Sequence, residues 1–152
     1  MDTPLDLSRL LAPANAGCDR NGPIARCHDG TREVLIAKIK QWIDKDPDLP
    51  ICWLHGPAGS GKSAVSHTVG EYCHSRKRLA ASFFFFRGAK NRSTIAPLVS
   101  TLAYQLSISV PATKPLLRNV LRTDPFISQR ALSYQFKKPQ IFPDSNPVVD
   151  RK

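Results

Sequence analysis

An eight-residue glycine-rich segment constrains this 152-residue chain more than any other feature. It matches the pattern G-x-x-x-x-G-K-[ST], the P-loop, and consists of Gly56, Pro57, Ala58, Gly59, Ser60, Gly61, Lys62 and Ser63. Glycines let the backbone curl so that successive N–H groups point at a phosphate. Lys62 would place its ammonium on the β and γ phosphates, and Ser63 would offer its hydroxyl to Mg²⁺. The motif therefore predicts binding of ATP or GTP together with Mg²⁺.

The residues on either side of this motif predict a strand before it and a helix after it. Residues 51–55 form an apolar run that leads directly into glycine, as a strand buried on both faces of a parallel sheet does. From Lys62 to about Lys77, apolar residues recur at helical spacing. Residues 80–86 include four consecutive phenylalanines and predict a second buried strand. We therefore expect an α/β fold, a P-loop NTPase-like three-layer fold that is partial: the P-loop strand, a second strand and flanking helices only.

The rest of the pattern divides the chain into three parts. Residues 1–30 are rich in loop-forming residues and predict a loosely structured lead-in. Residues 31–138 hold the predicted partial P-loop domain, whose other helices are expected from Thr31 to the proline at 47 and over 93–107, 116–122 and 128–138. Prolines recur every four residues from 139 onward, and they predict an irregular tail over 139–152.

Hydrolysis of a nucleotide requires a second metal ligand, usually an aspartate at the end of an apolar strand. No residue of this chain fits that pattern. The run 83–86 is followed by Arg87, a proline interrupts the run before Asp144, and the run before Asp150 is too short. Glu71 falls within a predicted helix, where an acid is usually solvated. The catalytic residues are therefore unknown, and we expect no competent hydrolysis by this chain alone.

Two arginines and four cysteines are further candidates. Arg87 and Arg92 follow the second predicted strand, on the side where a parallel sheet binds ligands, so contact with phosphate is one interpretation and a solvated basic loop is the simpler one. The cysteines lack the close spacing of zinc ligands, which favours free thiols over a metal site. They are Cys18, Cys27, Cys52 and Cys73.

Charge is distributed unevenly along the chain. The formal net charge is +10, and residues 76–152 hold 14 basic but only 3 acidic side chains. Such a basic half attracts polyanions. No recognition helix or pattern of stacking aromatic residues accompanies the charge, so nucleic acid is not the expected partner. An acidic complement on another segment or on a partner chain explains the imbalance more simply.

The hydrophobic runs give no sign of export or membrane insertion. The first residues carry two aspartates and lack the long apolar core of a secretory signal. The most apolar stretch, residues 80–86, is far too short to span a bilayer. We therefore expect a cytoplasmic protein with reduced thiols.

Several of these motifs together resemble a known family. The similarity covers roughly residues 27–138 and rests on Cys27, Gly30-Thr31-Arg32, Trp42, residues 51–63, Ala81-Ser82-Phe83-Phe84-Phe85, Arg87-Gly88 and Leu102-Ala103-Tyr104-Gln105-Leu106. In this combination the chain resembles the NACHT-type (STAND-class) NTPase modules of fungal NOD-like receptor proteins, close to the nephrocystin-like N-terminal P-loop domain.

The resemblance implies a signal-transduction ATPase that binds ATP or GTP and assembles with related NTPase chains. It implies that Gly56, Gly61, Lys62 and Ser63 contact the nucleotide. The family's acidic metal-binding strand, sensor arginine and winged helix would lie beyond residue 138, so the resemblance implies a module truncated before its catalytic half. In that family two later strands lie between the P-loop strand and the next strand in sequence.

Two other functions stay open at this point. A small P-loop kinase acting on a metabolite would suit the size of the chain, although no acidic substrate-binding residue stands out. A non-enzymatic interaction fragment would use the basic C-terminal half to bind related chains or polyanions. Salt-dependent binding to a polyanion would favour the fragment, and turnover of a small phosphate acceptor would favour the kinase.

Overall fold

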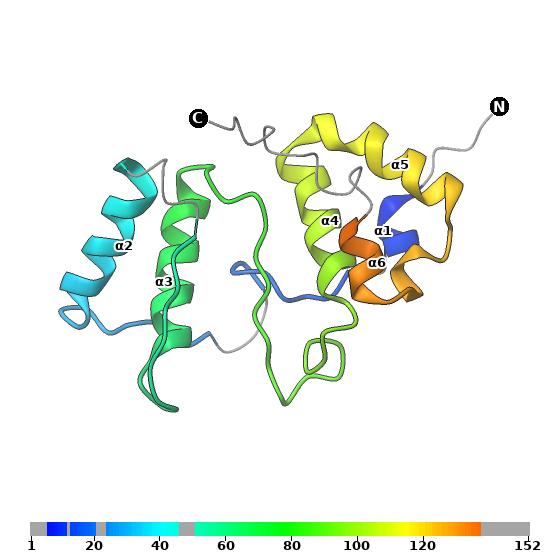
Figure 1. Cartoon of the computed structure of the whole chain (residues 1–152). Helices are drawn as coiled ribbons and strands as arrows, with labels where there is room; N and C mark the ends of the chain where they lie inside the picture. Colours follow the sequence, from blue (N-terminus) through cyan, green and yellow to red (C-terminus); the bar gives the residue numbers. More distant parts are fainter. Residues whose placement is uncertain (1–5, 12, 21–23, 46–50, 138–152) are drawn as a thin grey trace, which may run out of the picture. The chain divides into compact units, whose positions relative to one another are not determined.

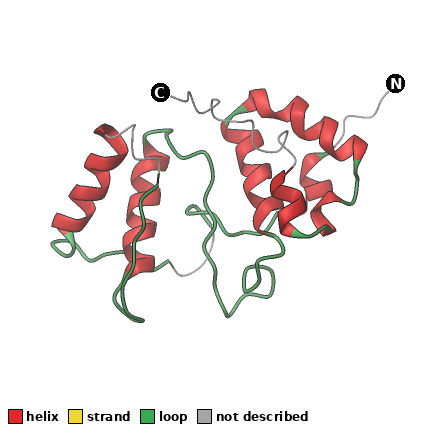
Figure 2. Ribbon diagram, viewed as in Figure 1, coloured by secondary structure: helices red, strands yellow, loops and turns green. Residues whose placement is uncertain are grey.

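The computed structural model describes residues 6–11, 13–20, 24–45 and 51–137 (Figure 1). Within these ranges all regular structure is helical and no residue lies in a strand (Figure 2). The chain forms two compact units. The middle unit spans residues 18–79, and the outer unit joins the residues up to 17 with those from 80 onward. In the described ranges, no helix combines the length and the apolar character that crossing a membrane requires.

Two helices build the middle unit, and both confirm the sequence prediction. They are α2 (Glu33–Lys45) and α3 (Lys62–Ser75). Asp44, near the end of α2, ties the two helices together because its carboxylate accepts hydrogen bonds from Tyr72, at 3.2 Å, and from Arg78. The Arg78 guanidinium also donates to the carbonyl oxygen of Ile43 at 2.9 Å. A polar clamp therefore fixes the end of α2 to the last turns of α3.

Short helices build the outer unit. In chain order they are α1 (Leu7–Leu11), α4 (Leu98–Ser109), η1 (Pro111–Thr113), α5 (Lys114–Thr123), η2 (Ile127–Gln129) and α6 (Leu132–Lys137). The helix expected from residue 93 begins five residues later. Pro97 occupies its N-cap position, and a proline disfavours helical geometry in the residue before it. Residues 13–17 are anchored to α4, since the Ala14 N–H donates to the Thr101 hydroxyl at 2.9 Å.

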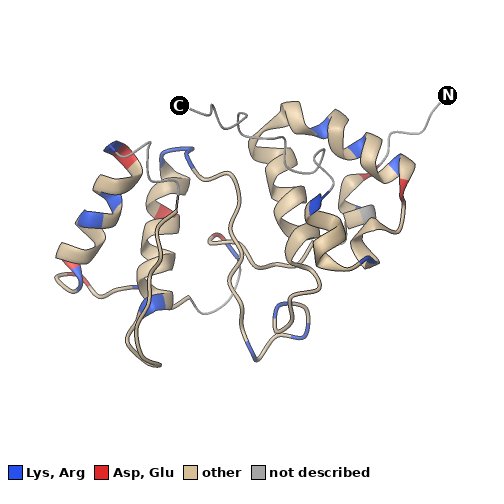
Figure 3. Ribbon diagram, in the orientation of Figure 1, with Lys and Arg blue, Asp and Glu red and all other residues tan. Residues whose placement is uncertain are grey.

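Helix α5 is strongly amphipathic. Its apolar side is buried through Leu117, Val120 and Leu121. Its basic residues lie four apart at Lys114 and Arg118 and again at Arg122, so they form a row along the helix beside the apolar side. Figure 3 shows these basic positions spaced along α5. The helix thus presents one side to the core and a row of positive charge to the outside.

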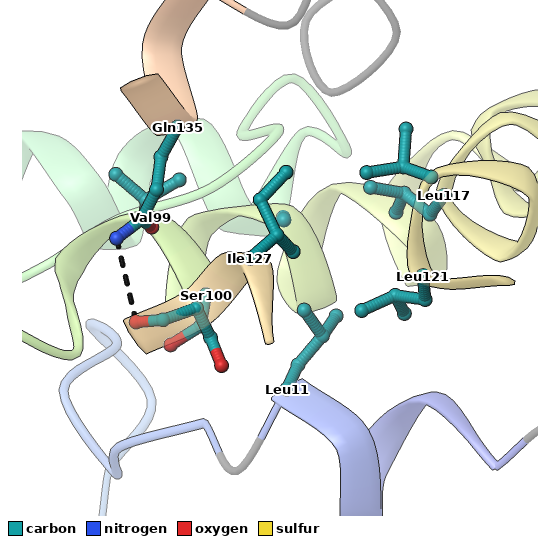
Figure 4. Close-up of a pocket in the computed structure, with 10 residues that line it drawn as sticks. Leu11, Val99, Ser100, Leu117, Leu121, Ile127 and Gln135 are labelled. Atoms are coloured by element: carbon teal, nitrogen blue, oxygen red, sulfur yellow. Dashed lines mark hydrogen bonds between the residues drawn. The ribbon is translucent and has the colours of Figure 1, made fainter. Parts of the chain in front are cut away.

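A single apolar cluster forms the core of the outer unit. Its buried members are Leu7, Leu11, Val99, Ala103, Leu117, Val120, Leu121 and Ile127. Figure 4 shows Leu11, Leu117, Leu121 and Ile127 converging on one another from three different parts of the chain. At the polar end of this cluster the buried Gln135 amide donates to the carbonyl oxygens of Ser128, at 3.3 Å, and Arg130, at 2.7 Å. The cavity that remains measures about 10 Å³, the lower limit for one water molecule, so the cluster is a packed core.

The predicted α/β three-layer fold is wrong, because neither predicted strand forms in the described residues. Residues 51–55 have no regular secondary structure and belong to no ladder, and Ile51 and Trp53 are 81% and 82% exposed. An extended segment becomes a strand only when neighbouring strands satisfy its backbone, and burial on both faces also requires layers on either side. The described residues supply neither a neighbouring strand nor covering layers, so the apolar run stays exposed to solvent.

The second predicted strand, residues 80–86, is held by separate hydrogen bonds instead of by a ladder. The Gln105 amide pairs with both backbone groups of Ser82: its Oε1 accepts from the N–H at 2.8 Å and its Nε2 donates to the carbonyl at 3.0 Å. The Phe84 N–H donates to the Ala16 carbonyl at 2.8 Å. Phe85 and Phe86 remain exposed, which corrects the prediction that the phenylalanines are buried. A glutamine thus takes the place that a neighbouring strand would occupy.

The division into a lead-in over 1–30, a domain over 31–138 and a tail over 139–152 stays a prediction. The tail lies outside the described residues.

Candidate phosphate-binding loop

The predicted P-loop residues lie at the start of α3, in the middle unit. Residues 56–61 form an irregular turn, and Lys62 and Ser63 are the first two residues of the helix. Gly59 and Gly61 have φ angles of 77° and 82°, in the left-handed region that favours glycine. A Cβ atom at either position would meet nothing within 4 Å. The turn therefore needs these glycines for its backbone conformation, and its surface beside them is open.

The Lys62 ammonium lies against the turn that precedes it. Its Nζ donates to the carbonyl oxygens of Gly56, at 2.7 Å, and Pro57, at 2.6 Å. A third contact, to the Ser60 hydroxyl, is longer at 3.4 Å. These contacts hold a positive charge at the N-terminal end of a 14-residue helix, where the helix dipole is also positive. The sequence motif thus places Gly56, Pro57, Ser60 and Lys62 in direct contact.

Arg32 is a neighbour of this loop that the motif did not reveal. It directly precedes α2, and its Nη2 donates to the Ser60 carbonyl oxygen at 2.9 Å. Its backbone has a φ of 58°, an uncommon value for a residue with a side chain. Arg32, together with Gly30 and Thr31, carried part of the family resemblance, but nothing in the spacing from 32 to 60 predicts the contact. A second positive charge therefore reaches the loop from the start of α2.

The rest of α3 is anchored by the segment that leads into α2. The Arg26 Nε lies 2.7 and 3.0 Å from the two carboxylate oxygens of Glu71, and the Cys27 N–H donates to the Thr68 hydroxyl at 3.3 Å. The hydrogen bonds from Arg26 lower the pKa of Glu71, although its partial burial acts in the opposite direction. Glu71 is thus an ion-pair partner of Arg26, where the sequence suggested a solvated acid.

The remaining candidates belong to other parts of the chain. Arg87 and Arg92 belong to the outer unit, where the Arg92 guanidinium lies 4.9 Å from the centre of the Phe86 ring. Asp144 and Asp150 lie outside the described residues. The four cysteines are free thiols, and burial raises the pKa of Cys73. In the described part of the chain, no group of three or more acidic, histidine or cysteine side chains is arranged to hold a metal.

A phosphate group fits the chemistry of the loop. Phosphate needs N–H donors, positive charge and little steric hindrance, and helix N-termini after glycine-rich turns supply all three. Here Gly61 brings no side chain to cap the first turn of α3, two glycines leave the surface open, and Lys62 supplies the charge. Ser63 is exposed on the first turn, where its hydroxyl would serve Mg²⁺.

Comparison with known proteins supports part of the resemblance predicted from the sequence. The model of the family described as Nephrocystin 3, N-terminal, matches residues 30–144, about three quarters of the chain. No curated protein and no solved structure matches the chain. The match confirms the nephrocystin-like part of the resemblance, while the NACHT and fungal parts stay predictions. The chain belongs to the nephrocystin 3 N-terminal family.

Proposed function

We propose that this chain binds a nucleoside triphosphate, ATP or GTP, together with Mg²⁺ through residues 56–63. The observation that supports it is the position of the Lys62 ammonium, which lies at the positive end of α3 and against a turn opened by Gly59 and Gly61. In this proposal the N–H groups of the turn and Lys62 bind the phosphates, and Ser63 binds the metal.

The proposal concerns binding and not turnover. Stabilising the transition state of phosphoryl transfer requires a second metal anchor and a group that orients the attacking water. The sequence contains no convincing candidate for the metal anchor. The wider role would be that of the N-terminal part of a NACHT-type signalling NTPase, cytoplasmic and assembling with related chains, as the family resemblance implies.

Titrating a fluorescent ATP analogue against the whole chain in the presence of Mg²⁺ tests the proposal. Lys62→Ala should weaken binding at least tenfold, since charge-assisted contacts contribute about 1.5–3 kcal/mol. The matched control is Lys38→Ala, which removes an exposed lysine from α2 and should leave the affinity unchanged. Equal affinities for the Lys62 and Lys38 variants would contradict the proposal.

A second substitution separates loss of binding from loss of folding. Lys62 contacts two carbonyl oxygens of the loop, so its removal also changes the loop. Ser63 is exposed, and Ser63→Ala should leave the far-UV circular dichroism unchanged while reducing the Mg²⁺ dependence of binding. A Ser63→Ala protein that binds the analogue with unchanged Mg²⁺ dependence would exclude the metal role of that residue.

A further inference from the structure

The basic half of the chain owes most of its charge to the outer unit, and the proposed nucleotide site uses none of it. Residues 80–137 contain eight lysines and arginines but a single acid, Asp124. That acid is already paired, because its Oδ2 lies 3.5 Å from the Arg130 Nε. Over residues 80–137, the positive charge is therefore almost uncompensated.

Helix α5 arranges part of this charge in a row. Lys114, Arg118 and Arg122 lie four residues apart on one side of the helix, and the row extends about 12 Å along the helix axis. None of the three forms an ion pair with another described residue. The two arginines are exposed. This regular row suits a ligand that carries negative charges at regular intervals.

Exposed aromatic rings follow directly after this row. Phe126 lies two residues beyond the C-cap residue Asp124 and is 62% exposed, and Tyr134 on α6 is 43% exposed. Arg130 connects the two positions: it pairs with Asp124, and its guanidinium lies 5.9 Å from the centre of the Tyr134 ring. The Phe126 N–H is itself held by the Asp124 carboxylate at 3.3 Å. Local contacts thus keep both rings near the end of α5.

We propose that this surface, named here the α5 surface and consisting of Lys114, Arg118, Arg122, Phe126 and Tyr134, binds single-stranded nucleic acid. The three cations would contact successive phosphates, and the two rings would stack on unpaired bases. Proteins that bind single strands without sequence preference combine a basic track with aromatic stacking in this way.

Other polyanions suit the α5 surface less well. An amphipathic helix binds a membrane by inserting its apolar side, but the apolar side of α5 is committed to the core through Leu117, Val120 and Leu121, each at most 3% exposed. Duplex DNA offers phosphates but keeps its bases paired and stacked, so Phe126 and Tyr134 would have no partner. An acidic protein surface would use the cations but gives the rings no specific role.

The test measures fluorescence anisotropy of labelled 12-nucleotide dT and rU oligomers with the whole chain, over a range of salt concentrations. Comparing the two oligomers distinguishes DNA from RNA. Affinity should fall linearly with salt on a logarithmic scale, with a slope of about −0.7 per phosphate contact. Replacing Lys114, Arg118 and Arg122 with glutamine should reduce the steepness of that slope by about 2.

A control with the same change in charge makes this result specific. Lys38, Lys45 and Lys77 are exposed lysines of the middle unit, and replacing them with glutamine removes the same three charges. That variant should keep the wild-type slope to within about 0.5. An equal reduction in both triple variants would mean that net charge alone attracts the oligomer, and it would overturn the proposal.

The aromatic residues are tested separately. Phe126→Leu and Tyr134→Leu keep an apolar side chain but remove the ring, and each should weaken binding by about fivefold or more, because base stacking on a ring contributes about 1–3 kcal/mol. The salt slope should not change. Unchanged affinity in both variants, equally tight binding of a 12-base-pair duplex or of anionic phosphatidylserine vesicles, or no binding of either oligomer at low salt would each overturn the proposal.

Discussion

Two adjacent leucines on α5 provide a sharp test of the packing in the outer unit. Leu117 is 1% exposed and belongs to the apolar core, whereas Leu116 is 38% exposed. Leu117→Ala removes three buried carbon atoms from a closely packed cluster and leaves a cavity in their place. Buried leucine-to-alanine substitutions destabilise by about 2–5 kcal/mol, so we expect a loss of about 3 kcal/mol in the free energy of unfolding.

The control is Leu116→Ala, which makes the same chemical change one residue away. It should cost less than about 1 kcal/mol, because the side chain is partly solvated in the folded state and alanine favours the helix slightly. Urea unfolding followed by far-UV circular dichroism compares the two. With a slope of about 1–3 kcal/mol per molar urea, Leu117→Ala should lower the midpoint by at least about 1 M. Similar midpoints for both variants would refute the core described for this unit.

Two further predictions concern contacts that hold segments in place. Glu71→Gln removes the ion pair with Arg26, whose hydrogen bonds lower the pKa of the Glu71 carboxyl. A lowered folded-state pKa contributes stability above the unfolded pKa and loses it as the pH falls, so the wild-type advantage in thermal unfolding curves should be present at pH 7 and decline as the pH falls below the usual pKa of a glutamate. An advantage independent of pH would contradict this. Gln105→Ala leaves the backbone groups of Ser82 without their side-chain partner. The loss should lower the free energy of unfolding by about 1–3 kcal/mol and speed hydrogen exchange at Ser82. The control Gln41→Ala, on the exposed side of α2, should change neither quantity. Unchanged exchange at Ser82 would show that Gln105 does not hold this segment.

Local features of this protein could be predicted from its sequence. Helices α2 and α3 follow from apolar residues at helical spacing, and α2 ends before the proline at 47 as expected. The glycine-rich motif predicted the turn at Gly59 and Gly61, since few other residues adopt its backbone angles. Combined motifs along the chain also identified the nephrocystin-like family. The helices and the turn depend on residues close together in the chain, and the family assignment depends on residue identities alone.

The tertiary structure decided what depends on distant residues. Residues 51–55 have the composition of a buried strand, yet a strand exists only where another segment satisfies its backbone, and no described segment does so. Residues 80–86 form backbone hydrogen bonds with Gln105 and Ala16, and no pattern in the segment itself predicts these partners. The contact of Arg32 with the loop spans 28 positions and likewise depends on packing. Periodicity and motifs encode local backbone preference, whereas pairing across the chain is settled by which partners the folded structure brings within reach.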